Sequence, residues 1–173
     1  EGLWYKKGSG FASNEGPGDN GEYDNEHMDI IRELLLDYTY VEIDQIYDPT
    51  GTVAQGEAAL NEGRSILNYT GHGSNGSFGN GCPMNNTDVN GLENSGMWPF
   101  IWSVACVNGE FHIGTCFAET WLRATNSDGN PTGAITTLMS TVNQAWNPPM
   151  AGQDEMNAIL AESYSNNTKR TFG

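Results

Sequence analysis

A short apolar run from Trp98 to Ala105 constrains the fold of this chain more than any other feature, because a cysteine, Cys106, follows it directly. A run of this length with almost no polar side chain is typical of a strand that is covered on both faces. Such strands occur in parallel sheets with helices on each side. The run therefore predicts an α/β domain with Cys106 at the carboxyl end of a central strand.

The rest of the chain alternates between helical and strand patterns, which indicates an α/β domain with a largely parallel sheet. Long loops rich in Gly and Asn, or in Trp and Pro, are expected at Ser74–Gly96 and Thr141–Pro149. Helices are expected around Met28–Leu35, over Val53–Asn61, over Cys116–Ala124 and over Gln153–Tyr164, and strands at Trp4–Phe11, Val41–Ile46, Ser65–Tyr69, Trp98–Ala105 and Gly133–Ser140.

Length and charge limit the classes of function. A chain of 173 residues with 37% hydrophobic residues suits one globular domain, and a start at Glu1 rather than Met indicates an excerpt of a longer chain. A net charge of −15 would repel a phosphate backbone, so nucleic-acid binding is not expected. No apolar run reaches about 18 residues, so membrane insertion is not expected either. The acidity could steer cationic substrates inward, or merely keep a secreted protein soluble.

The three cysteines, Cys82, Cys106 and Cys116, are an odd number, so at least one thiol cannot pair within the chain. Cys106 follows one predicted strand, and His72 follows the strand before it, Ser65–Tyr69. Ligands of open α/β sheets bind at the carboxyl ends of the strands, and neighbouring parallel strands would place these two side chains close together. A histidine beside a cysteine favours the reactive thiolate. The spacing therefore predicts a Cys-His dyad.

The alternative is that Cys106 is a buried core thiol and His72 a polar turn residue. Glycines favour the functional interpretation, since Gly71 and Gly73 flank His72 and allow a substrate to approach the backbone closely. The backbone N–H groups of Gly73 and Cys106 are then candidates for an oxyanion hole.

The remaining cysteines and histidines give weaker signals. Cys82, in a predicted surface loop, is expected to be an ordinary loop thiol, and Cys116, at the start of a predicted amphipathic helix, to pack inward. Neither Cys-x-x-Cys nor His-x-x-x-His spacing is present, and His27, His72 and His112 are scattered along the chain. This pattern does not favour a zinc site.

Two segments, Asn68–Ser74 and Pro99–Phe111, closely resemble the histidine and cysteine blocks of the gingipain family of cysteine peptidases, peptidase family C25. The resemblance is strongest to the arginine-specific members and covers nearly the whole chain. It continues through Ala12–Gly16, Asn20–Asp24, Cys116–Glu119, Ser140–Trp146, Gly152–Asn157 and Lys169–Gly173.

The resemblance implies a caspase-like, three-layer α/β/α fold, with residues 1–173 as the catalytic subdomain but without the subdomain that precedes it and the segment that follows it in the family. It also implies a secreted or bacterial cell-surface endopeptidase that hydrolyses peptide bonds through a thioester, acting on proteins or peptides with arginine at P1. No cofactor is expected to be required. Calcium is expected as a structural ion at most, on residues that the sequence does not identify.

The resemblance further implies catalytic roles for three residues. Cys106 would be the nucleophile, His72 the general acid/base, and Glu15 the carboxylate that supports the histidine. Glu15 lies in an acidic, Gly-rich stretch whose ordinary interpretation is a solvated loop.

Substrate-binding roles are implied for Asp24, Trp146 and Gln144. Asp24 would be the S1 carboxylate that pairs with the substrate guanidinium, and Trp146 the aromatic that covers the S1 pocket. Without the resemblance, Asp24 could instead cap the helix that begins near it, and Trp146 could close a loop over the core.

Two other functions remain open. A gingipain-related transpeptidase that processes exported proteins would resolve the same thioester with an amine, although the Val107–Phe111 segment after the cysteine favours the peptidase. A surface or adhesion module with an idle site would have no need of Glu15, Asp24, His72 and Cys106 together.

Overall fold

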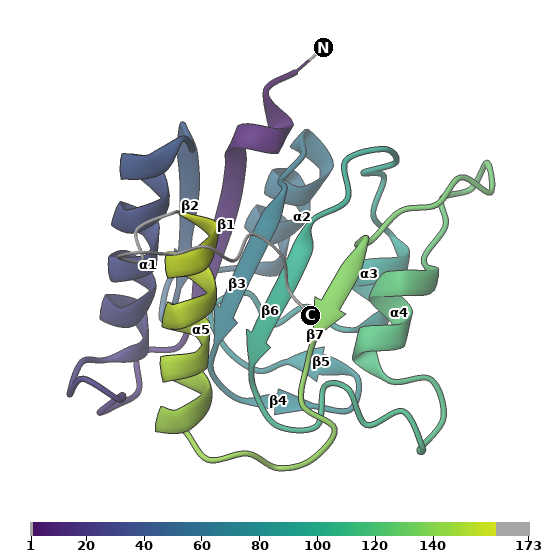
Figure 1. The fold of residues 1–173 in the computed structure, drawn as a ribbon. Coiled ribbons are helices and arrows are strands. Elements are labelled where there is room, and N and C mark those ends of the chain that lie inside the picture. The colour runs from purple at the N-terminus through teal and green to yellow at the C-terminus, as the bar shows by residue number, and fades with distance from the viewer. Residues whose placement is uncertain (1, 162–173) are drawn as a thin grey trace.

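The computed structural model describes residues 2–161, which form a single sheet with helices on both faces and a small hairpin (Figure 1). The strands of the main sheet are β1 (Lys7–Ala12), β2 (Glu42–Tyr47), β3 (Ile66–Thr70), β6 (Phe100–Val104) and β7 (Thr136–Leu138), and the hairpin consists of β4 (Gly73–Ser74) and β5 (Ser77–Phe78). The helices are η1 (Trp4–Lys6), α1 (Asp24–Tyr38), α2 (Val53–Glu62), α3 (Asn86–Asn90), α4 (Phe117–Arg123) and α5 (Asn147–Leu160).

The main sheet has the strand order β2-β1-β3-β6-β7, and every neighbouring pair is parallel. The register aligns the ends of the three central strands, because Ala12 lies beside Thr70 and Thr70 beside Val104. The carboxyl ends therefore meet along one edge, at the bottom of Figure 1. β3 lies in the middle and is buried along its whole length.

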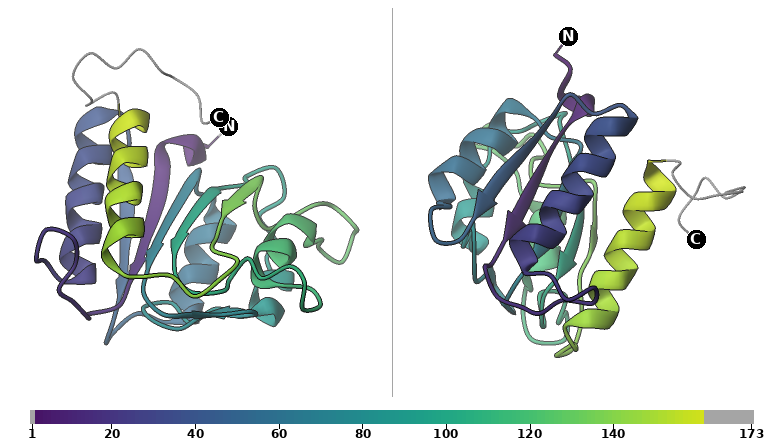
Figure 2. Two further views of the ribbon diagram at one scale, coloured as in Figure 1. Left: turned by 60° about the horizontal axis from the view of Figure 1, so that its bottom comes forward. Right: turned by 90° about the vertical axis from the view of Figure 1, so that its left-hand side faces the viewer.

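Helices α1 and α5 cover one face of the sheet, and α2, α3 and α4 cover the other (Figures 1 and 2). Each face has its own apolar core. The smaller core joins Ile31 and Leu35 of α1 to Met156 of α5, and the larger contains Leu60 of α2 and Trp121 of α4. The expected three-layer α/β/α architecture is confirmed.

The segment Ser74–Gly96 is not the long surface loop that its Gly and Asn content predicts. It forms the β4–β5 hairpin and α3, and its few apolar side chains enter the larger core. Burial of these side chains holds the segment against the sheet even though its helix and strands are very short. Those at most 1% exposed are Phe78, Cys82, Met84, Val89 and Leu92.

Helix α5 begins at Asn147, earlier than predicted, because Pro148 falls in its first turn, where a missing N–H is tolerated. The predicted end of this helix at Tyr164 lies outside the described residues. Buried amides fix α5 to β3, since Asn68 and Asn157 exchange hydrogen bonds of 3.0 and 3.1 Å. Within residues 2–161, the structure contains no helix with the length and apolarity needed to cross a membrane.

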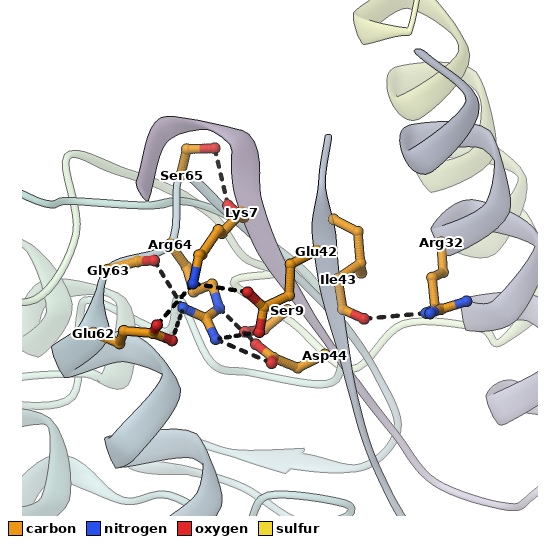
Figure 3. A network of polar contacts seen from close by, with 10 residues as sticks. All are labelled: Lys7, Ser9, Arg32, Glu42, Ile43, Asp44, Glu62, Gly63, Arg64 and Ser65. Carbon is orange, nitrogen blue, oxygen red and sulfur yellow. Dashed lines mark hydrogen bonds and ion pairs between the residues drawn. The ribbon is translucent and has the colours of Figure 1, made fainter. Parts of the chain in front are cut away.

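An ionic cluster lies near the beginnings of β1, β2 and β3 (Figure 3). The Arg64 guanidinium pairs with Asp44 at 2.6 and 3.1 Å and with Glu62 at 2.9 Å, and it donates to the Gly63 carbonyl oxygen at 2.9 Å. The Arg64 side chain is only 2% exposed. Its charge is thus enclosed by anionic and carbonyl partners.

Candidate functional site

The backbone around His72 is held firmly just beyond the end of β3. The Tyr69 hydroxyl donates to the His72 carbonyl oxygen at 2.5 Å and accepts the N–H groups of Gly79 and Asn80 at 3.1 Å. The His72 N–H donates to Asn80 Oδ1 at 3.0 Å. The imidazole itself remains 57% exposed. The backbone of this loop is therefore held in place, while the imidazole, which can accept and donate a proton, is exposed to solvent.

Cys106 follows β6 in the same way. The next residue, Val107, has a φ of 49°, which a β-branched residue rarely adopts, and its N–H donates to the Val142 carbonyl oxygen at 3.2 Å. The Cys106 thiol lies 3.8 Å from the Gln144 carbonyl oxygen, and the Gln144 amide donates to the Ala105 carbonyl oxygen at 3.0 Å. The turn at the cysteine is thus strained and braced by the segment that leads to α5.

The histidine and cysteine segments are packed against each other. A Cβ added at Gly73 would lie 2.8 Å from Ala105 Cβ and 2.9 Å from the Cys106 carbonyl oxygen, so only glycine fits there. The buried Asn108 amide donates to the carbonyl oxygens of Ser74 and Ser77 at 2.7 and 2.9 Å. The chain beyond Cys106 is therefore fastened to the hairpin beyond His72, as the predicted neighbouring strand ends require.

Two backbone N–H groups of these packed segments are candidates for an oxyanion hole. Gly79 donates to the His72 carbonyl oxygen at 2.9 Å, which makes Gly73 and Phe78 a non-hydrogen-bonded pair of the hairpin. The Gly73 N–H consequently points away from β5. Among residues 2–161, the Cys106 N–H has no hydrogen-bond partner. Both groups can donate a hydrogen bond to an oxygen that develops negative charge, but their role as an oxyanion hole stays a prediction.

Glu15, which follows the end of β1 closely, lies against His72. Its two carboxylate oxygens are 3.1 and 3.2 Å from His72 Nε2. This contact places a proton on Nε2, because a carboxylate can only accept, and it leaves Nδ1 free to interact with a thiol. The structure thus brings together Glu15 and His72, the pair that the family resemblance implies, and their catalytic roles stay predictions.

Asp24, the first residue of α1, is fully buried beneath Trp146. The Trp146 indole N–H donates to Asp24 Oδ1 at 2.9 Å, and the Ser13 hydroxyl donates to Oδ2 at 2.5 Å. Burial raises the pKa of the Asp24 carboxyl, and the two hydrogen bonds oppose that rise. The Trp146 ring also meets the His72 ring edge-on, with centroids 5.1 Å apart. Trp146 therefore links Asp24 to the predicted catalytic residues.

Ser13 and Asn108 are positioning residues that the sequence analysis did not identify. The Ser13 hydroxyl accepts the Glu15 N–H at 3.0 Å while it donates to Asp24, so it holds two of the predicted site residues in register. Asn108 accepts the Ser103 hydroxyl at 2.9 Å and braces the hairpin. Ser13 directly follows β1, just as His72 and Cys106 closely follow β3 and β6. This position at the end of a strand is the sequence feature that could have identified Ser13 as a site residue.

The prediction for Cys82 is wrong. Its side chain is completely buried beneath α2, and burial raises the pKa of the thiol to about 12. Cys116 is 1% exposed at the start of α4, which confirms that it packs inward. Cys106 is the half-buried member of the three and the one beside a histidine segment.

A separate group of ionisable side chains could hold a metal ion. Asp19, His27 and Asp154 each offer a ligand atom, and these atoms lie within 4.8 Å of one another. The group lies between the loop before α1 and the side of α5.

Comparison with known proteins identifies the family to which the chain belongs. The sequence model described as peptidase family C25 matches residues 1–173. Gingipain R2 and gingipain R1 of Porphyromonas gingivalis are each 47% identical to the chain over 176 residues. These alignments cover the whole chain but only 24% and 18% of the two relatives, so the chain spans a quarter or less of their length.

Solved structures give the same result. The crystal structure of the Arg-specific cysteine proteinase gingipain R matches with a TM-score of 0.93 at 47% identity, over 98% of this chain and 40% of that one. A complex of the pro- and mature domains of a Porphyromonas gingivalis gingipain matches with a TM-score of 0.91 at 48% identity, again over 98% and 40% of the two chains.

Proposed function

Since this chain belongs to peptidase family C25, we propose that it is part of the catalytic region of a secreted or cell-surface cysteine endopeptidase that cuts after arginine. The observation that carries the proposal is the convergence at the carboxyl ends of three neighbouring strands. There, Glu15 contacts His72, and Gly73 packs against the backbone of Cys106. Calcium remains a proposed structural ion, and no cofactor is needed for the chemistry below.

The proposed chemistry begins with the Cys106 thiol. His72 accepts its proton, and the thiolate attacks the carbonyl carbon of the scissile bond. The negative charge that develops on the carbonyl oxygen is stabilised by the N–H groups of Gly73 and Cys106. His72 then donates its proton to the departing amine, which leaves a thioester on Cys106. Water, deprotonated by His72, hydrolyses the thioester and restores the free thiol.

Glu15 orients the imidazole through this cycle. Its contact with Nε2 leaves Nδ1 available to accept the proton of the thiol and stabilises the positive charge that forms on the ring. Because both side chains are more than half exposed, this support is screened by solvent and is weaker than in a buried pair.

Arginine selectivity is assigned to Asp24. Its carboxylate has four lone-pair sites, of which Ser13 and Trp146 occupy two, so a guanidinium could take the others as a planar bidentate pair. Trp146 closes the approach to Asp24 and, with Glu15, Gly16 and Pro17, lines a surface cavity of about 210 Å³. The acidic net charge of −15 would also draw cationic substrates toward the site.

Activity-based labelling tests the proposal on the full-length protein. An arginine-directed acyloxymethyl ketone should modify Cys106 alone, as mapped by mass spectrometry, and the lysine-directed probe should react much more slowly. A Cys106→Ala variant is the matched control and should not be labelled. Modification of Cys82 or Cys116, or a faster reaction with the lysine probe, would contradict the proposal.

A further inference from the structure

Side chains connect the carboxyl end of β2, an edge strand of the main sheet, to the backbone of His72. Asp48 directly follows β2, and β1 lies between this strand and β3, which His72 closely follows. Asn80, in the loop after β5, bridges the two residues. Its Nδ2 donates to Asp48 Oδ2 at 2.8 Å, and its Oδ1 accepts the His72 N–H at 3.0 Å. A continuous chain of hydrogen bonds therefore runs from the edge strand to the predicted catalytic base.

The two neighbours of Asn80 fix the orientation of its amide. A carboxylate can only accept hydrogen bonds, and a backbone N–H can only donate. Asn80 therefore directs its amino group to Asp48 and its oxygen to His72. The other Asp48 oxygen, Oδ1, accepts the Gly81 N–H at 2.8 Å, so the same loop also holds the carboxylate in place. Asp48 thus determines which atom of Asn80 faces the His72 N–H.

The loop that carries Asn80 is packed tightly across the ends of β1 and β2. Gly81 has a φ of 60°, and a Cβ there would lie 2.7 Å from the Ala12 carbonyl oxygen and 2.6 Å from that of Ile46. The next residue, Cys82, is completely buried in the larger core. The support that reaches His72 through Asn80 therefore comes from a well-anchored part of the fold.

The His72 backbone is held from both sides. Its carbonyl oxygen accepts from the Tyr69 hydroxyl at 2.5 Å and from the Gly79 N–H at 2.9 Å, and its N–H donates to Asn80. The imidazole, in contrast, is 57% exposed, and its pair with Glu15 is screened by solvent. Because that pair orients the ring only weakly, the position of the imidazole depends on the position of the backbone.

We propose that Asp48 is a positioning residue for His72 and acts through Asn80. By orienting the Asn80 amide, Asp48 holds the backbone where the imidazole contacts Glu15. Loss of this orientation releases the His72 turn, and a displacement of about 1 Å is enough to slow a reaction many-fold. The effect on catalysis rests on the proposed function, whereas the effect on the His72 backbone does not.

Exchanging the two side chains tests the proposal in the full-length protein. Asp48→Asn makes two amides face each other, and Asn80→Asp makes two carboxylates face each other, so each single change loses a contact. The double variant restores every hydrogen bond. Its amide at position 48 accepts from Gly81 and donates to the new carboxylate at position 80, which in turn accepts the His72 N–H. Asp37→Asn, at an exposed position of α1, is the matched control.

Catalysis and backbone order are measured separately. With a fluorogenic arginine peptide, each single variant should lower kcat by at least about tenfold and change KM less than about twofold, because Asp24 is not part of the network. Hydrogen exchange of the His72 amide is measured by mass spectrometry with Cys106→Ala as the background, so that it does not depend on peptidase activity. It should accelerate about tenfold in each single variant, as expected for one lost hydrogen bond.

The double variant should recover both quantities to within about threefold of the parent, and Asp37→Asn should change neither. If Asn80→Asp does not fold, Asn80→Ala removes the same contacts without adding a charge.

Three outcomes would overturn the proposal. Single variants with unchanged kcat and a lower unfolding temperature would show that the network only stabilises the fold. A double variant as slow as the single variants would show that the orientation of the Asn80 amide does not matter. Unchanged exchange of the His72 amide would show that Asp48 does not hold the backbone. If the parent does not hydrolyse the arginine peptide at all, the proposed function fails instead, and the exchange measurement still decides the role of Asp48.

Discussion

The two ends of the main sheet differ in how their buried charged side chains are paired. Near the beginnings of the strands, the Arg64 guanidinium is enclosed by Asp44, Glu62 and a carbonyl oxygen (Figure 3). At the carboxyl ends, Asp24 is equally buried, yet among residues 2–161 its carboxylate accepts only from the neutral donors Ser13 and Trp146. The carboxylates near the strand beginnings thus have a cationic partner, Arg64, whereas Asp24 has none among the described hydrogen bonds.

This difference indicates that one end of the sheet stabilises the fold and that the other can bind a ligand. The fully paired, buried Arg64 joins β2 to α2 just before the start of β3, and it has no N–H group left for a ligand. A buried carboxylate without a cationic partner carries a desolvation penalty, which is why burial raises the pKa of Asp24. We infer that the guanidinium of an arginine substrate is the cationic partner of the Asp24 carboxylate.

The largest effect on catalysis is expected at the carboxyl end of the sheet, from substitution of the predicted nucleophile and base. Cys106→Ala and His72→Ala should each lower kcat/KM by about 10³-fold or more, because either change removes the thiolate attack. The double variant should be no slower than the single variants, since the two residues act as one unit. Rates with a fluorogenic arginine peptide, together with circular dichroism to confirm folding, measure this. Near-normal turnover in His72→Ala would show that another group is the base.

Arg64→Met should have the reverse effect, on stability and not on turnover. It leaves Asp44 without its charge partner in a largely buried position, and should destabilise this region by about 3 kcal/mol. Hydrogen exchange of peptides from β2 and β3, read by mass spectrometry, should accelerate correspondingly. Arg123→Met is the control, because its pair with Glu119 is exposed and should contribute less than about 0.5 kcal/mol. Unchanged exchange in Arg64→Met would mean that the enclosed cation does not stabilise the sheet.

Asp24→Ala should lower kcat/KM for arginine substrates by roughly 10²-fold, because the guanidinium then loses the carboxylate proposed to form a bidentate pair with it. Cleavage after uncharged residues should hardly change. Matched peptides that differ only at P1, with arginine, lysine or norleucine, provide the measurement and its control. If the Asp24→Ala variant is still selective for arginine, or if the unmodified protein prefers lysine, Asp24 is not the carboxylate that binds the P1 side chain.

The smallest effect is expected from Glu15→Gln. An amide can still accept from His72 Nε2 but does not stabilise the imidazolium, and the pair is exposed to solvent. We expect about a tenfold loss in kcat with little change in KM for arginine peptides. Steady-state kinetics tests this, and a loss as large as that of His72→Ala would mean that Glu15 takes part in proton transfer itself.

The sequence predicted the central sheet well because its signals are local. The apolar run Trp98–Ala105 and the turn at His72 identified two neighbouring strand ends, and the structure places them side by side. The segment Ser74–Gly96 was mispredicted because its apolar residues have neither helical nor strand spacing, and their burial depends on α2 and α4. The early start of α5 was missed because prolines in a first turn resemble a loop.

The site was predictable only in part, for a related reason. The assignments of Glu15, Asp24 and Trp146 came from the family resemblance, since nothing in their local sequence distinguishes them from loop residues. The contact between Asp24 and Trp146 spans 122 positions of the chain. Likewise, His27 meets Asp154 only after α1 and α5 have packed on the same face, so histidine spacing along the chain gave no sign of that cluster.

The aligned ends of β1, β3 and β6 also have a consequence for how the chain folds. Glu15 and His72 are 57 residues apart, and each lies beyond a different strand, so no early local structure contains the site. Loop closure must bring all three strands into register first, and parallel pairings of this kind form slowly. A nascent or partly folded chain therefore holds a dispersed thiol, imidazole and carboxylate with no proteolytic power. Under the proposed function, the peptidase site would therefore form only after these three strands have paired, late in folding.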